Sequence, residues 1–132
     1  MAQLERSRGD LWAAKLRRCR CWVEKMQPPP TGMPDWLVAC PTSGLRLVAY
    51  PTGGLRLVEA KTLEAVQEAE ECRPWCACSG AQQFMLRMLH EHGGQVGILV
   101  VGPNGYVDLD YEASLAPLSV ALFEQLEVPY DG

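Results

Sequence analysis

The chain has 132 residues and a formal net charge of −4, with 48% hydrophobic and 21% charged residues. This length suits one domain with a single core, and the composition excludes a wholly disordered chain. No apolar run approaches the roughly 20 residues of a membrane-spanning helix, and the opening residues MAQLERSRGD lack the apolar stretch of an export signal. We therefore expect a cytoplasmic protein whose six cysteines are reduced.

Basic residues are concentrated at the N-terminus. Residues 1–25 contain seven basic and three acidic side chains, a net charge of +4, which leaves −8 for the rest of the chain. Such asymmetry predicts that the two parts either face different partners or pair with one another.

Residues 10–26 are predicted to form a basic amphipathic helix. Asp10 is a suitable N-cap, apolar residues follow at three- and four-residue spacing, and the prolines at 28–30 would end the helix. We interpret 27–34 as a proline-rich connection to an α+β body at 35–128. Among the helix residues, Arg17, Arg18 and Trp22 are candidates for binding a partner.

The clearest pattern is a near-repeat of GLRLVAY at 44–50 and GLRLVEA at 54–60, separated by Pro-Thr-Gly. A repeat this short predicts a β-hairpin rather than a solenoid. A two-residue turn would place Arg46 opposite Glu59, with Val48 and Tyr50 on the same face. Both faces of such a hairpin are apolar, so we expect another chain to cover one of them, most simply in a homodimer.

The remaining patterns complete the predicted fold. A strand is expected at 35–41, helices at 61–71 and after Ser79, strands at 97–101 and 106–111, and a last helix after Ser114. The helix after Ser79 should turn a stripe toward the core, formed by Ala81, Phe84, Met85, Met88 and Leu89. The prediction is a single α+β domain at 1–132, with about five mostly antiparallel strands in the order α-β-β-β-α-α-β-β-α.

Cysteines and histidines form a weak metal candidate. Cys72, Cys76 and Cys78 are followed by His90 and His92, but their spacing matches no standard zinc knuckle. Cys76 or Cys78 could alternatively act as a nucleophile if a helix N-terminus lowered the thiol pKa. We expect ordinary free thiols and no metal site.

A small-molecule pocket is the second kind of site to consider. Trp36, Trp75, Tyr106 and Asp108 are the natural lining residues of a pocket between sheet and helices. Asp108 also alternates with Asp110 and Glu112 along one strand, a pattern typical of a solvated strand face.

No catalytic or cofactor motif occurs: the sequence lacks a P-loop, a G-x-G-x-x-G motif and a Ser-His-Asp signature. We therefore predict no cofactor and a non-catalytic protein–protein interaction module of chaperone, immunity or inhibitor/adaptor type. The element order resembles that of the dimeric chaperones of bacterial secretion systems, which would imply a bacterial or phage-like source. A small ligand-binding protein or enzyme, and a weak nucleic-acid binder acting through the basic helix, are the alternatives.

Overall fold

A computed structural model describes residues 2–26, 32–40 and 54–131 of the chain. Its centre is a six-stranded sheet in the order β1-β2-β3-β4-β5-β6, so neighbours in sequence are neighbours in the sheet. Every pair is antiparallel except β3 and β4, which are parallel. The predicted α+β class and mostly antiparallel sheet are confirmed, with six strands rather than about five.

The N-terminal segment departs from the prediction of one helix at 10–26. Helix α1 spans Ala2–Arg18 and strand β1 spans Trp22–Lys25. The helix ends where Arg20 adopts a left-handed φ of 67°. Burial then alternates along β1, as expected of a strand with one covered face. The apolar spacing read as one long helical stripe is therefore a helix followed by a strand, and Asp10 lies inside the helix rather than at its cap.

Strand β3 (Gly54–Thr62) contains the second arm of the near-repeat. Its neighbours are β2 (Trp36–Cys40) on one edge and β4 (Val96–Val101) on the other. Glu59 pairs with Ile98 of β4, and the Ala60 amide on the other edge donates to Asp35. The predicted partner of Glu59, Arg46, lies outside the described residues, so that pair stays a prediction. The first arm, residues 44–50, lies outside the described residues.

The parallel connection from β3 to β4 carries helix α2 (Leu63–Glu68), two 3-10 turns at Glu70–Cys72 and Pro74–Ala77, and helix α3 (Gly80–Glu91). Parallel strands need such a crossover. The predicted caps are confirmed: the Thr62 side chain accepts from Ala65, and Ser79 forms a capping box with Gln82. Gly93, with a φ of +87°, follows α3 as the predicted stop.

The predicted inward stripe of α3 is wrong in its orientation. Phe84 is 57% exposed, whereas Leu86, which the stripe omits, is 1% exposed. A helix that meets a sheet along a narrow line buries few residues, and Leu86 is the buried one in α3. Helix α3 has apolar residues on more than one side, and helical spacing alone does not predict which side faces the core.

The C-terminal part forms β5 (Gly105–Asp110), the short helix α4 (Tyr111–Ser114), α5 (Val120–Leu126) and β6 (Val128–Pro129). Ser119, not Ser114, caps the last long helix, since its side chain accepts from the Leu122 amide. The helices of the described ranges include none that is both long and apolar enough to cross a membrane.

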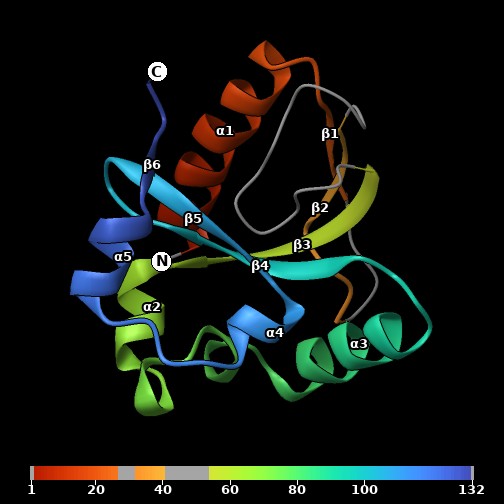
Figure 1. Cartoon of the computed structure of the whole chain (residues 1–132), viewed down its shortest axis with the longest axis vertical. Helices are drawn as coiled ribbons and strands as arrows, with labels where there is room; N and C mark the ends of the chain where they lie inside the picture. Colours follow the sequence, from red (N-terminus) through yellow and green to blue (C-terminus); the bar gives the residue numbers. More distant parts are fainter. Residues whose placement is uncertain (1, 27–31, 41–53, 132) are drawn as a thin grey trace.

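Helices cover both faces of the sheet, α1 on one side and α2, α3 and α5 on the other (Figure 1). On the α1 side, Trp12 and Trp36 make an edge-to-face contact with ring centroids 5.4 Å apart. Gly9 allows this close approach, because a Cβ there would lie 3.3 Å from the Trp36 ring. On the other side Val66, Leu86 and Phe123 pack against β4 and β5. The sheet therefore separates two hydrophobic cores.

Candidate functional site

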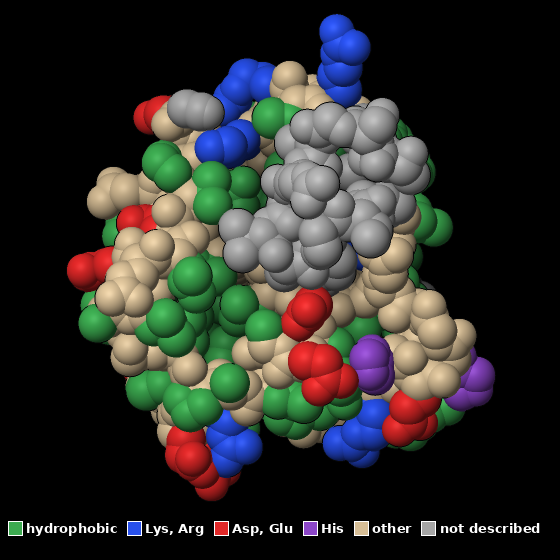
Figure 2. Space-filling model, viewed as in Figure 1, with side chains coloured by type: hydrophobic (Ala, Val, Ile, Leu, Met, Phe, Trp, Pro, Cys, Tyr) green, Lys and Arg blue, Asp and Glu red, His purple; other side chains and the backbone are tan. Residues whose placement is uncertain are grey.

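Four basic residues of α1 bind other segments of the chain through hydrogen bonds or an ion pair. Arg17 donates to the Val23 carbonyl, Arg18 to the Tyr130 carbonyl and Lys15 to the Pro129 carbonyl. Arg8 pairs with Glu64 at 2.7 Å. Figure 2 shows Lys and Arg side chains gathered at the end of the molecule where α1 finishes. The prediction that the basic and acidic parts pair with one another is thus confirmed for Arg8 and Glu64.

The four residues predicted to line one pocket lie on opposite sides of the sheet. Trp36 and Tyr106 belong to the core under α1, whereas Trp75 packs against the core on the other side. Trp75 contacts Tyr111 edge to face, with ring centroids 5.5 Å apart. The four residues therefore do not line one pocket, because the three strand residues face the α1 side while Trp75 lies in the 3-10 turn Pro74–Ala77 on the other side.

Asp108 is buried, which contradicts its predicted place on a solvated strand face. It is 5% exposed and accepts a hydrogen bond of 2.5 Å from Nη2 of Arg56, which is 1% exposed. Burial raises the pKa of Asp108 above its ordinary value, while the Arg56 guanidinium acts to lower it. The pair links β3 to β5 inside the fold. Its burial makes it a structural element rather than a site open to substrate.

The three cysteines of the metal candidate do not gather in the described part of the chain. Cys72 Sγ donates to the Gln67 carbonyl and Cys78 Sγ to the Pro74 carbonyl, and both are free thiols, as is Cys76. Burial raises the pKa of Cys78 to about 12. The lowered pKa that a nucleophile would need is therefore contradicted for Cys78, although the residue lies directly before the α3 cap.

An exposed apolar face remains on the β1–β2–β3 half of the sheet, on the side of α2 and α3. We define the Trp22 face by six side chains that cross-strand pairing places on one side: Trp22, Ala39 and Leu55 in one row, and Glu24, Leu37 and Leu57 in the next. Trp22 is 52% exposed and Leu55 is 59% exposed. Strand neighbours in direct register point the same way, so these side chains form one surface and not scattered points.

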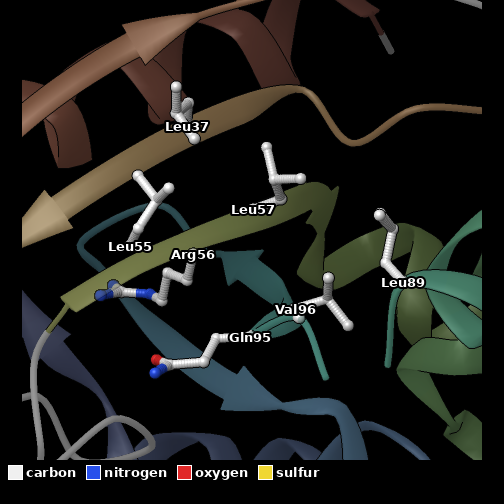
Figure 3. Close-up of a pocket in the computed structure, with 8 residues that line it drawn as sticks. Leu37, Leu55, Arg56, Leu57, Leu89, Gln95 and Val96 are labelled. Carbon is white, nitrogen blue, oxygen red and sulfur yellow. The ribbon is translucent and has the colours of Figure 1, made fainter. Parts of the chain in front are cut away.

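The Trp22 face deepens into a small groove where it meets α3. Its volume is about 120 Å³, and Leu89 of α3 and Val96 of β4 line it together with residues of the face. Figure 3 shows Leu37, Leu55 and Leu57 projecting on the same side of the sheet, while Arg56 extends away. Small-molecule sites have volumes of roughly 300–1,000 Å³, so this groove is better suited to receiving one side chain than a metabolite.

A cluster of three carboxylates lies around Glu59 of β3, away from the small groove of the Trp22 face. Glu5 of α1, Asp35 before β2 and Glu59 of β3 have ligand oxygens within 4.8 Å of one another. Glu59 is 2% exposed. Burial, followed by the adjacent Asp35, raises the pKa of Glu59 to about 10. Burial and Asp35 also raise the pKa of Glu5.

These residues were not among the sequence-based candidates. Glu5 and Asp35 carry no motif, because they are 30 positions apart and come together only in the fold. Glu59 and Arg56 did offer a signal, since each is a charged residue within an apolar strand. The two remaining partner-binding candidates, Val48 and Tyr50, lie with Arg46 outside the described residues.

Comparison with known proteins gives no relative: no family model, curated protein or solved structure matches the chain. The resemblance in element order to secretion chaperones therefore stays a prediction.

Proposed function

We propose that this protein is a non-catalytic protein–protein interaction module that binds through the Trp22 face. The observation that carries the proposal is the exposed row of Trp22, Ala39 and Leu55, in direct register on three strands. A contiguous apolar surface of this kind is typical of an interaction site. Tryptophan is also the residue type most enriched among the anchors of protein interfaces.

The occupant we propose is a second copy of the chain, packed face to face. Five of the six side chains of the Trp22 face are uncharged, and its one acidic residue, Glu24, lies on the edge strand β1. Two copies can therefore meet over the apolar side chains with Glu24 at the rim, although each has a net charge of −4. Edge-to-edge pairing through β1 is less favourable, because this edge strand has only four residues and ends in Glu24 and Lys25.

The test is the mass of the protein in solution. Light scattering over a range of micromolar concentrations should give a dimer for the natural sequence and a monomer for Trp22→Lys/Leu55→Lys. Leu11→Lys is the matched control, since Leu11 is 50% exposed but lies on α1, across the sheet. That variant should remain dimeric.

Two results would overturn this function. One is a monomeric natural sequence at the highest concentration. The other is a dimer that survives Trp22→Lys/Leu55→Lys, which would move the interface to another surface.

A further inference from the structure

The strongest unassigned feature is the carboxylate cluster of Glu5, Asp35 and Glu59. It joins three segments that are distant in sequence, the first turns of α1, the residue before β2 and the middle of β3. An acidic cluster at a surface usually disperses its charge into water. This one includes Glu59, which is 2% exposed, and so it calls for a specific explanation.

The two oxygens of the Glu59 carboxyl differ in their hydrogen bonds. Its Oε2 accepts a hydrogen bond of 3.2 Å from Gln82 Nε2, while its buried Oε1 accepts none from an N–H or hydroxyl group of the described residues. The direction of the Gln82 amide is fixed, because its Oε1 accepts from the Ser79 amide and from Lys61. The Glu59 side chain also makes a hydrogen bond with Asp35, so in the metal-free chain the two carboxyls share a proton, which a bound cation would displace.

We propose that Glu5, Asp35 and Glu59 bind one hard divalent cation. Carboxylate oxygens are the preferred ligands of such ions, and ligands on opposite sides of Ca²⁺ are roughly 4.6–5.2 Å apart. The ligand oxygens of the cluster, all within 4.8 Å of one another, fit that span. Asp35 Oδ2 is already oriented by the Ala60 amide, which donates to it at 3.2 Å.

Nearby charges set the strength of this site. Lys25 and Lys61 both act to lower the pKa of Glu5 and therefore compete with a cation. Lys61 is drawn toward α3 by its hydrogen bond of 3.0 Å to Gln82, and Lys25 lies over the Trp36 ring, 5.1 Å from its centroid. Glu5 and Asp35 are half-buried, so an ion could enter from solvent and keep some of its water.

The experiment uses the full chain, freed of metal by chelation, and titrates Ca²⁺ and Mg²⁺ separately by calorimetry and thermal unfolding. Saturable binding of one ion per chain and a higher unfolding temperature are expected. Glu59→Gln and Asp35→Asn should each weaken the affinity tenfold or more. Glu68→Gln, an exposed carboxylate on α2 outside the cluster, should leave it within twofold.

A second readout uses Tb³⁺, which replaces Ca²⁺ and emits when a nearby tryptophan is excited. Trp36 follows the ligand Asp35 directly in the chain, so sensitised emission is expected from the natural sequence and should be lost in Asp35→Asn. Circular dichroism confirms that each variant is folded.

Two results would overturn the site. One is the absence of saturable binding. The other is equal binding by Glu59→Gln, Asp35→Asn and the natural sequence.

Discussion

The two faces of the sheet are covered to different extents. On the α1 face, Trp12 and Leu16 are 0% and 1% exposed and the cover reaches from β1 to β5. On the opposite face the helices cover β4 and β5, where Ile98 and Val100 are 0% exposed. There, Trp22 and Leu55 remain half exposed or more.

This difference separates residues that hold the fold from residues free to bind. The side chains beneath α1 can be explained by folding alone, because burying an aromatic or leucine side chain contributes about 1.5–3 kcal/mol. The Trp22 face receives no such explanation within one chain. Trp22 and Leu55 keep half or more of their surface exposed after folding, so a partner is the simplest reason for them.

Replacing one tryptophan on each face should give the largest contrast. Trp12→Ala is expected to lower the free energy of unfolding by about 3–5 kcal/mol, because it leaves a cavity under α1. Trp22→Ala should change it by only about 0.5 kcal/mol, as for other exposed positions. Urea unfolding followed by circular dichroism measures both. The natural sequence and Trp12→Ala should unfold with a dependence on protein concentration that Trp22→Ala loses. Similar losses from the two variants would refute the contrast.

The buried Arg56–Asp108 pair should be the next most sensitive point. Arg56→Met leaves the Asp108 carboxylate buried without its cation, which should cost about 3 kcal/mol or more. The double variant Arg56→Met/Asp108→Leu removes both charges and should recover most of that loss. Urea unfolding of the single and double variants gives the coupling energy. Additive losses would show that the two side chains act independently.

Glu59 should make the folded protein less stable as the pH rises. Its pKa is raised from 4.5 to about 10 in the fold, so the folded chain keeps a proton that the unfolded chain releases. In metal-free buffer, the free energy of unfolding should therefore fall as the pH rises from about 5 toward 10.

The matched variant for this pH dependence is Glu59→Gln, whose amide cannot ionise. It should flatten the fall and stabilise the protein at pH 8 by at least about 1.4 kcal/mol, the equivalent of one pKa unit. Chemical unfolding across that pH range measures the effect. An unchanged slope in Glu59→Gln would show that another group carries it.

Local chemistry made much of the fold predictable. Thr62 and Ser79 predict helix starts because their side-chain oxygens can accept from the first backbone amides of a helix. Gly93 predicts a helix end because glycine tolerates the positive φ found there. The buried strand predicted at 97–101 from its continuous apolar run is β4, Val96–Val101. These signals depend on a few adjacent residues, so tertiary structure does not alter them.

The errors arose where distant segments compete. The near-copies at 44–50 and 54–60 favoured a hairpin, yet β3 is bordered by β2 and β4, which the repeat does not reveal. Spacing also could not distinguish one long helix from a helix followed by strand β1, since Cys19 and Val23 fit both periods. The carboxylate cluster was out of reach for the same reason, because its members share no local pattern.

The smallest expected effect concerns the ion pair that joins α1 to α2, and its pH dependence has the opposite sign to that of Glu59. Arg8 lowers the pKa of Glu64 from its ordinary value of 4.5, so the pair stabilises the fold above that pH and loses its contribution as the pH falls through the folded pKa. Because the Glu64 side chain is 47% exposed, solvent screens the pair and its contribution should be about 1 kcal/mol or less.

The matched change is Glu64→Gln, which should destabilise the protein at pH 7 and have a smaller effect near pH 3, because protonation of Glu64 at lower pH removes its charge. Urea unfolding at the two pH values makes the comparison, with Glu68→Gln as the control on the same helix. Arg8 keeps its hydrogen bond of 3.1 Å to the Val101 carbonyl in either case. An equal loss of unfolding free energy at both pH values would mean that Glu64 acts through packing rather than charge. The hydrogen bond to the Val101 carbonyl would then be the main polar contact between Arg8 and the sheet.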